Sequence, residues 1–388
     1  MSPPFRLMLY EPGCQGHPIG WIRYLLHVFA EKDRDLALDL AAPPQVQSSL
    51  VADVAAARDA GREVKVLSLP PAAGRPEELL SLLVRHKPDG VLFLELTPWE
   101  RWLAHHPLPC TVAGILFVQY PEIDPSCGPL LQRMERWLRR QVKEHRTARW
   151  LRLQQWRAVF LLNGERACRY LNQRFSKTPV FRPIPDPIPP PEIAGEEGGA
   201  PPQRRTRLRF LHLGVLSARK GMHIGLRALE YVSPEWAKAC EVRIVGAVEA
   251  HYKSVFQSAV QELRRRRPDI QMTWEERYLS EKEFESELAA TNWLWLPYLR
   301  TEYSSGILAH AARWGKPVLG PSDGLIGHLI THHSLGRVCT IEPRALAAAL
   351  EQAYREPFVA DETQRVAFVH RSSPAVFAQS LLDVFTPS

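Results

Sequence analysis

A glycine and lysine loop in the C-terminal half has the residue types that bind phosphate. Gly214 ends an apolar segment, and Arg219 and Lys220 stand just before a segment of helical periodicity. A glycine lets the backbone approach a ligand closely. A lysine beside the free N–H groups of a helix N-terminus adds positive charge there. These parts suit a diphosphate, and the alternative is an ordinary strand-to-helix turn with a solvated Arg-Lys pair.

A second loop could bind an anion next to a sugar. Ser304, Ser305 and Gly306 stand at the start of a predicted helix, where several backbone N–H groups are exposed. Glu302, just before them, could accept hydrogen bonds from sugar hydroxyls. The alternative is a well-capped helix packed on a sheet. Both loops follow predicted strands, and ligands of open α/β sheets bind at the carboxyl ends of the strands.

Strand and helix signals alternate along the whole chain, and they predict the elements that position these loops. The predicted strands of the N-terminal half are Phe5–Tyr10, Leu36–Ala41, Val64–Leu69, Gly90–Leu96, Val112–Val118 and Val159–Asn163, and its helices include Trp21–Ala30, Ser48–Ala60 and Pro76–His86. The predicted strands of the C-terminal half are Leu208–Gly214, Glu241–Val245, Asp269–Thr273, Trp293–Pro297 and Pro317–Gly320. Such alternation predicts parallel sheets covered by helices on both faces.

The length and one proline-rich stretch predict two domains. A chain of 388 residues is too long for one ordinary core. We expect an N-terminal Rossmann-like domain at 1–182, a Pro/Gly-rich linker at 183–206, and a C-terminal Rossmann-like domain at 207–372. A final helix at 373–388 follows, and it could pack back on the N-terminal domain.

Four short motifs in the C-terminal half occur together in one family. They are Gly214 with Lys220-Gly221, then Ile244-Val-Gly246, then Leu296-Pro-Tyr298, and then Glu302 with Gly315-Lys-Pro-Val318. Their order and spacing resemble the donor domain of retaining GT-B glycosyltransferases over roughly residues 180–355. The resemblance implies an α/β protein whose two doubly wound domains face a central cleft.

The resemblance also implies an activity and the residues that perform it. The chain would move a sugar from a nucleoside-diphosphate sugar to a glycan or lipid acceptor with retention, without a metal or a cofactor. The donor-binding residues would be Gly214, Arg219, Lys220, Gly246, Glu302, Ser304, Ser305, Gly306 and His310. Glu302, Lys220 and His17 would be the catalytic residues, and Gly13, Gly16 and His17 would form the acceptor-side loop.

Three departures from the family pattern leave two interpretations open. Val215 stands where the family usually has an arginine, and His310 stands where it usually has a second glutamate. The family histidine after the strand Val112–Val118 is also absent, and His17 is the nearest substitute by topology. The chain is either a divergent active transferase or a protein that keeps the fold as a sugar-, nucleotide- or partner-binding module. A sugar-nucleotide 2-epimerase is a further enzyme class with this architecture.

A basic, tryptophan-bearing stretch at 129–156 has three interpretations. The stretch is a solvated helix packed on the sheet, a helix lying on an anionic membrane surface, or a nucleic-acid site. No other feature of the sequence supports nucleic-acid binding. The net charge of +7 favours anionic partners. The six cysteines form no CxxC pair, and we find neither a secretion signal nor a bilayer-spanning run. We therefore expect a cytoplasmic protein, at the inner face of the membrane in the second interpretation.

Overall fold

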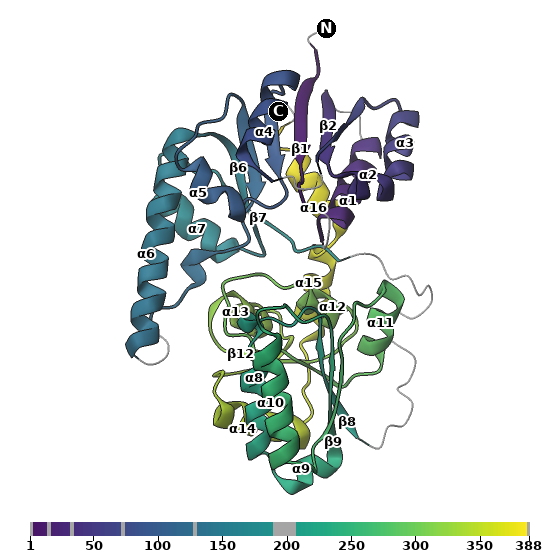
Figure 1. Ribbon diagram of the computed structural model, residues 1–388, viewed down its shortest axis with the longest axis vertical. Coiled ribbons are helices and arrows are strands. Elements are labelled where there is room, and N and C mark those ends of the chain that lie inside the picture. Colours follow the sequence, from purple (N-terminus) through teal and green to yellow (C-terminus); the bar gives the residue numbers. More distant parts are fainter. Residues whose placement is uncertain are drawn as a thin grey trace. The chain divides into compact units, whose positions relative to one another are not determined.

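The protein divides into two compact units, which we describe separately. A computed structural model describes residues 3–13, 17–31, 35–70, 74–126, 130–188 and 207–385, with the backbone alone for residues 17 and 18. Unit 1 consists of Met1–Pro189 and Ser372–Ser388, and unit 2 of Pro190–Arg371. The chain thus leaves unit 1, forms unit 2 and returns to unit 1 (Figure 1).

Unit 1 contains a seven-stranded parallel sheet in the order β3-β2-β1-β4-β5-β6-β7. Its strands are β1 (Phe5–Tyr10), β2 (Leu36–Ala42), β3 (Val64–Ser68), β4 (Gly90–Phe93), β5 (Thr111–Ile115), β6 (Gln155–Leu162) and β7 (Phe181–Ile184). The helices among its described residues are α1 (His17–Glu31), α2 (Pro44–Ser49), α3 (Val51–Asp59), α4 (Pro76–His86), α5 (Glu100–Leu103), α6 (Leu130–Leu153), α7 (Glu165–Arg174) and α16 (Pro374–Leu382).

Unit 2 contains a six-stranded parallel sheet in the order β10-β9-β8-β11-β12-β13. Its strands are β8 (Leu208–Leu213), β9 (Cys240–Val245), β10 (Gln271–Glu275), β11 (Trp293–Trp295), β12 (Val318–Pro321) and β13 (Gly336–Cys339). The helices among its described residues are α8 (Met222–Ala228), α9 (Pro234–Ala239), α10 (Lys253–Arg266), α11 (Glu281–Ala289), α12 (Ile307–Arg313), α13 (Gly324–His332), α14 (Pro343–Arg355) and α15 (Glu362–Arg371).

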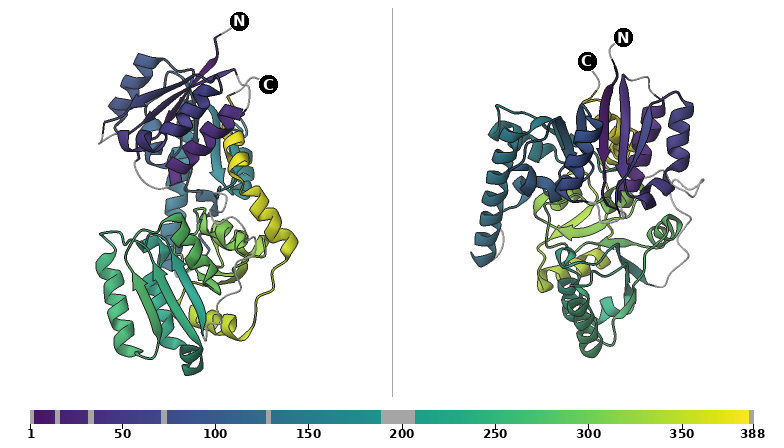
Figure 2. Two further views of the ribbon diagram at one scale, coloured as in Figure 1. Left: turned by 90° about the vertical axis from the view of Figure 1, so that its right-hand side faces the viewer. Right: turned by 45° about the horizontal axis from the view of Figure 1, so that its top comes forward.

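Both sheets are doubly wound, as the alternating sequence pattern predicted. The first strand of each unit lies inside its sheet, and the order reverses beside it, between β1 and β4 in unit 1 and between β8 and β11 in unit 2. Helices cover both faces of each sheet (Figure 2). The strands are buried on both sides, with β2 buried along its whole length. Ligand sites of such sheets lie beside the reversal point, at the carboxyl ends of the strands.

Some element boundaries differ from the sequence-based prediction. The predicted helix Ser48–Ala60 is two helices, α2 and α3, with Leu50 between them. Phe181–Ile184 is a strand although it contains Pro183, because β7 is the edge strand, where a proline is tolerated. The first two residues of the range predicted to be a linker therefore belong to this strand. The prediction also missed the strand β13 and the helices α5, α7, α9, α13 and α15.

The C-terminal helix α16 completes the core of unit 1. Phe377 packs against Trp21 of α1, with ring centroids 5.0 Å apart, and Phe385 packs against Phe5 of β1 at 5.8 Å. Phe377 and Phe385 are 0% and 1% exposed. The amide of Ile188 donates a hydrogen bond to the carbonyl of Ser372, so the outgoing and returning chain segments are joined where they meet unit 1.

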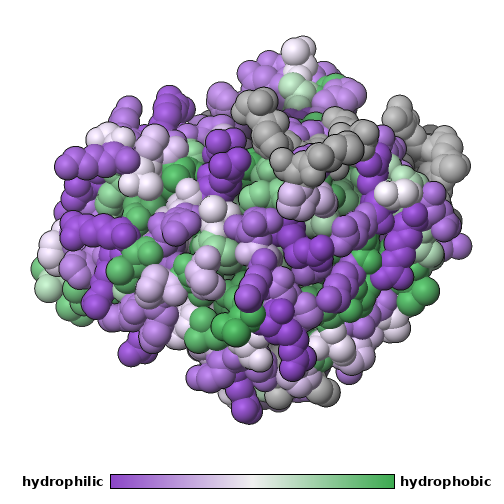
Figure 3. All heavy atoms as spheres, turned by 90° about the horizontal axis from the view of Figure 1, so that it is seen from above, coloured by the Kyte–Doolittle hydropathy of each residue, from purple (hydrophilic) through white to green (hydrophobic). Residues whose placement is uncertain are grey.

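The surface carries hydrophobic side chains mostly in small groups. Figure 3 shows one face of the molecule as mainly hydrophilic, with separate hydrophobic patches. Among the described residues, no helix combines the length and the apolar character that crossing a bilayer requires. Scattered patches of this kind are usual for a protein surface.

Candidate functional site

Two glycines bring the carboxyl ends of β8 and β9 into close contact. Gly214, after β8, has a left-handed φ of 97°. A Cβ atom at Gly246, after β9, would lie 2.1 Å from the carbonyl oxygen of Gly214, so no other residue fits there without a backbone shift. This narrow approach lets the loop that follows β8 fold over the edge of the sheet.

We expect Gly246→Ala to disrupt this edge of unit 2. The added methyl group would force the Gly214 carbonyl away, at a cost of about 2–4 kcal/mol in the free energy of unfolding. The change should lower the urea midpoint of unfolding and weaken binding of any anion at the loop. Gly61→Ala is the control, because that glycine also has a positive φ, of 77°, and a Cβ there would meet nothing within 4 Å. Equal destabilisation by the two changes would contradict the assigned role of Gly246.

Lys220 is a buried cation beside this glycine pair. It ends the short turn Ala218–Lys220 and is only 9% exposed. A Cβ atom at Gly214 would lie 3.1 Å from the Lys220 Nζ atom, and that atom lies 5.7 Å from the centroid of the Tyr298 ring. No carboxylate of the described residues forms an ion pair with Lys220. Burial lowers the pKa of Lys220, and the nearby Tyr298 acts in the opposite direction.

His212 and Tyr298 surround the lysine with uncharged polar groups. His212 lies within β8, is fully buried, and its Nδ1 atom is 3.0 Å from the carbonyl oxygen of Trp295. Burial lowers the pKa of His212 to about 3, and the charge of Lys220 adds to this effect, so the ring is neutral. The His212 Nε2 atom is buried and has no hydrogen-bond partner in the part of the chain that the structure describes, and the buried Tyr298 hydroxyl lies beside Lys220. Because the neutral ring donates its Nδ1–H to the Trp295 carbonyl, its Nε2 atom can only accept a hydrogen bond, so Tyr298 is the member of this pair that could donate to an anion at Lys220.

The two loops predicted from sequence lie together in the structure. The carbonyl of Arg219 accepts hydrogen bonds from the amides of Leu299, at 2.8 Å, and Arg300, at 3.2 Å. A Cβ atom at Gly221, whose φ is 64°, would lie 2.1 Å from the carbonyl oxygen of Pro297. The Arg219 guanidinium lies 5.2 Å from the centroid of the Tyr303 ring. The loops after β8 and β11 therefore form one surface at the reversal point of the sheet.

Glu302 is a buried carboxylate on this surface. It is 3% exposed, and its Oε1 atom lies 3.6 Å from the Nη1 atom of Arg300, whose side chain is 41% exposed. The preceding residue, Thr301, accepts the amide hydrogen bonds of Leu325 and Ile326 at the start of α13. This anchor holds Glu302 against the sheet while Arg300 faces the surface.

The remaining predicted donor residues lie at the start of α12. Ser304, Ser305 and Gly306 are half-buried and precede this helix. The helix has only seven residues, so its dipole adds little charge and the cations carry more of the expected anion affinity. His310 is half-buried and its ring packs against Phe284, with centroids 4.8 Å apart.

The predicted acceptor-side loop is described only in part. The amide of Gly13 donates a hydrogen bond to the Oε1 atom of Glu11 at 2.7 Å. Gly16 lies outside the described residues. His17 is the first residue of α1, and its side chain is not described either. Val215, at the position of the family arginine, is 38% exposed and offers no charge.

Two carboxyl groups gather at the matching edge of unit 1. Glu11 follows β1 and Glu95 follows β4, so they lie beside the point where the strand order reverses. Glu11 is 4% exposed, and its Oε2 atom has no hydrogen-bond partner among the described residues. Burial raises the pKa of Glu11 to about 7, and the negative charge of Glu95 contributes. Burial also raises the pKa of Glu95.

The sequence-based prediction missed several residues of these edges. Tyr298 and Arg300 are in the second loop but were not predicted to take part, and His212 lies inside an apolar strand. A histidine between buried aliphatic residues is itself a signal, because it must find a partner or stay neutral. Glu11 follows a strand directly and could have been found in the same way.

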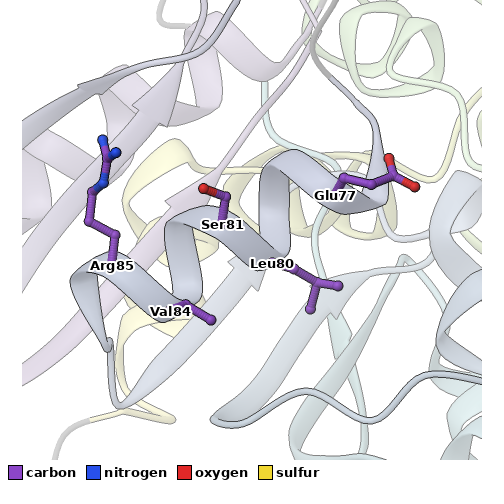
Figure 4. Close-up of a pocket in the computed structure, with 5 residues that line it drawn as sticks. All are labelled: Glu77, Leu80, Ser81, Val84 and Arg85. Atoms are coloured by element: carbon purple, nitrogen blue, oxygen red, sulfur yellow. The ribbon is translucent and has the colours of Figure 1, made fainter.

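The surface hollows found elsewhere are separate from these edges. One of about 510 Å³ is bordered by Glu77, Leu80, Ser81, Val84 and Arg85. All five residues lie along α4, so the hollow is an open groove on one helix (Figure 4). It contains none of the predicted site residues. Among the described residues, no three His, Cys, Asp or Glu side chains are grouped to hold a metal ion.

Two doubly wound parallel units of this kind define the GT-B fold, and solved structures with that fold cover almost the whole chain. The predicted fold class is therefore confirmed. The structure of Alr3699/HepE from Anabaena, solved with UDP and glucose, is 15% identical, with a TM-score of 0.59 and coverage of 98% of this chain and 96% of that one. A glycosyltransferase from Rickettsia africae is 10% identical, with a TM-score of 0.63 and coverage of 99% and 98%.

WaaG, described as a glycosyltransferase of lipopolysaccharide biosynthesis, is also similar in structure. It is 13% identical, with a TM-score of 0.61 and coverage of 99% of this chain and 100% of that one. No protein-family model matches the sequence, and no curated protein matches it. The relationship is therefore visible in the fold and not in the overall sequence.

Proposed function

We propose that the protein is a glycosyltransferase that takes a sugar from a nucleoside-diphosphate sugar. The observation that carries the proposal is Lys220, a buried lysine with no carboxylate partner among the described residues, next to the close approach of Gly214 and Gly246. A buried unpaired cation is costly, and a bound anion offsets that cost. The site lies where open α/β sheets bind ligands.

In this proposal each site residue has one role. Lys220 and Arg219 hold the diphosphate and stabilise the charge that develops on it as the sugar leaves. Gly214 and Gly246 give the diphosphate access to the backbone, and the Ser304–Gly306 segment adds N–H donors. Glu302 accepts hydrogen bonds from the transferred sugar, and His310 faces the ribose.

The acceptor would be a glycan or a lipid-linked sugar, bound through the Gly13, Gly16 and His17 loop. Donor phosphate oxygens would receive the proton of the acceptor hydroxyl, which is compatible with retention at the anomeric carbon. The protein would need no metal, because the cations of the chain would neutralise the diphosphate. The solved complexes of Alr3699/HepE with UDP and with UDP-glucose support a donor of the UDP-sugar type.

Calorimetric titration with UDP, GDP, ADP and their sugar derivatives tests this proposal. We expect one of these nucleotides to bind with a dissociation constant below millimolar. If none of them binds at millimolar concentration, the donor site is rejected. Donor turnover with an added glycan or lipid acceptor then separates a transferase from a binding module that keeps the fold. Val215 and His310 are the residues that favour the second candidate, since neither supplies the charged group usual in the family.

We also propose that α6 lies on an anionic membrane surface. The second half of the helix is fixed to unit 1, because Trp150 is fully buried and Lys143 forms an ion pair with Glu100. Its first turns extend past α5 and α7 (Figure 1). These turns expose a row of apolar side chains, which are Leu130, Leu131, Met134, Trp137, Leu138 and Val142. Arginines on the same helix would contact lipid phosphates.

Replacing Trp137 and Leu138 by glutamine should weaken membrane binding. The two side chains are 55% and 57% exposed, so the protein fold does not depend on them. Their transfer into the interface is worth about 1.5–3 kcal/mol together, and partition should fall at least about tenfold. The measurement is co-sedimentation with vesicles of anionic or of zwitterionic phospholipid.

The matched control for this change is Val84→Gln on α4, where the side chain is 69% exposed. It should leave vesicle binding unchanged. Equal binding of the double variant and the unchanged protein would reject the contact through α6. In the proposal the protein then acts in the cytoplasm at the inner face of a membrane. The free thiols of Cys110, Cys168, Cys240 and Cys339 suit that reducing compartment.

A further inference from the structure

The donor surface must balance the negative charge of a bound diphosphate. A diphosphate joined to a sugar carries one negative charge on each phosphate, and it gains another as the sugar leaves. Lys220 and the neighbouring Arg219 supply positive charge to this surface. Val215 supplies none. A third cation on the same surface would balance the charge that the leaving diphosphate gains.

Arg300 is placed to be that cation. Its amide and the amide of Leu299 both donate to the carbonyl of Arg219, the residue before Lys220. The backbone of Arg300 is thus fixed within one residue of the lysine. Its side chain is 41% exposed. The planar guanidinium can bind two phosphate oxygens at once.

The present partner of Arg300 is Glu302, and the contact is weak. The closest atoms, Nη1 and Oε1, are 3.6 Å apart, which is longer than a charge-assisted hydrogen bond. Solvent screens the charge of Arg300, which is partly exposed, while Glu302 is buried. Glu302 is buried and anchored through Thr301, so the mobile partner of the pair is the arginine.

We propose that Arg300 exchanges partners when the donor binds, leaving Glu302 and pairing with the diphosphate. Glu302 then no longer pairs with Arg300 when the hydroxyl groups of the transferred sugar approach it. The inference rests on the proposed function, because it assigns a third cation to the same donor site. It explains how one loop serves both parts of a nucleotide-sugar, since the pair separates into a phosphate ligand and a sugar ligand.

The exchange predicts opposite effects for the two members of the pair. Arg300→Gln should weaken the binding of the diphosphate by about fivefold to tenfold, because a charge-assisted contact is lost. Glu302→Gln should strengthen it by about twofold to fourfold, because the arginine no longer has a competing carboxylate. In the double variant the gain should vanish, and affinity should equal that of Arg300→Gln alone. Arg300→Lys should restore part of the loss.

The experiment is calorimetric titration of the full chain with UDP, GDP, ADP and the corresponding monophosphates. The effects of Arg300→Gln should be larger for the diphosphate than for the monophosphate of the same base, and should shrink as salt is raised. The matched control is Arg355→Gln, which removes an exposed arginine paired with Glu351 at 3.2 Å in the same unit. It should leave nucleotide affinity unchanged.

The outcomes separate this inference from the proposed function. If the unchanged protein binds a diphosphate and Arg300→Gln binds it equally well, the exchange is rejected while the donor site stands. If Glu302→Gln weakens diphosphate binding, the two residues do not compete, and the exchange is again rejected. If no nucleotide binds the unchanged protein, both the donor site and the partner exchange are rejected. Opposite effects of the two single changes, with a double variant that binds as weakly as Arg300→Gln, support the exchange.

Discussion

Replacing Lys220 by methionine is expected to weaken nucleoside-diphosphate binding by about 1.5–3 kcal/mol and to stabilise the fold at the same time. The first effect follows from the loss of a charged donor beside Gly214. The second has a separate cause, since burial lowers the pKa of Lys220 and the folded state thus holds this proton less tightly than the unfolded state. Methionine has a similar length and carries no charge that burial would penalise.

The sign of the pH dependence follows from the same shift. Raising the pH removes the proton from Lys220 in the folded protein before it does so in the unfolded chain, so the cost of the buried charge falls as pH rises through the lowered pKa. The affinity of the unchanged protein for a diphosphate should fall over the same range, because the cation is lost. The Lys220→Met variant should show neither trend.

A second lysine of unit 2 provides the control. Lys316 is also partly buried, its Nζ donates to the carbonyl of Ala289 at 3.0 Å, and burial lowers its pKa. It stands in the Gly315–Val318 motif but is not one of the predicted donor-binding residues, and its Nζ is held at the end of α11. Lys316→Met should leave nucleotide affinity unchanged, as measured by calorimetry. A loss of affinity as large as that of Lys220→Met would remove the reason for assigning the diphosphate to Lys220.

Replacing Glu11 by glutamine should stabilise unit 1 above neutral pH. Folding raises the pKa of this carboxyl from 4.5 to about 7, chiefly by burial. Its contribution to stability is therefore full below about pH 4.5 and is lost as the pH rises through about 7. The shift corresponds to a cost of about 3 kcal/mol for the ionised group. Glutamine avoids that cost but makes a weaker bond to the Gly13 amide, which leaves a net gain of about 2 kcal/mol.

Urea unfolding at several pH values measures this effect. The midpoint of the Glu11→Gln variant should exceed that of the unchanged protein at pH 8, and the difference should disappear near pH 4.5. Glu77→Gln changes an exposed carboxylate on α4 and should give no such pH-dependent difference. If Glu11→Gln destabilises the protein at pH 8, then the carboxylate has a partner that offsets its burial. A residue kept at a cost to stability is often kept for function.

The fold could be read from the sequence because its signals are local. An apolar run such as Val91 to Leu94 reports a strand buried on both faces, and β2 and β8 have the same character. The edge strands gave weaker signals. β13 begins with Gly336 and is only partly buried, and β7 contains Pro183, so neither resembles a central strand. Such strands are stabilised by their one neighbour in the sheet rather than by their own composition.

The candidate donor site could be outlined from the sequence for a similar reason, and its role stays a prediction. Gly214, Lys220 and Glu302 stand at strand ends, where the topology gathers side chains. The contacts of these residues could not be predicted from the sequence, because the hydrogen bond from the Arg300 amide to the Arg219 carbonyl joins two loops that are distant in the sequence. The neutral state of His212 depends on burial and on the charge of Lys220, which are properties of the folded unit.

Because the chain returns to unit 1, the two units complete their folding in a fixed order during synthesis. Unit 2 is a single continuous stretch, so it can fold as soon as Arg371 has left the ribosome. Unit 1 includes α16, and its core around Trp21 and Phe5 stays incomplete until Phe377 and Phe385 have been made. The half of the chain that is synthesised first therefore finishes folding last, and its apolar surface around α1 needs protection during translation.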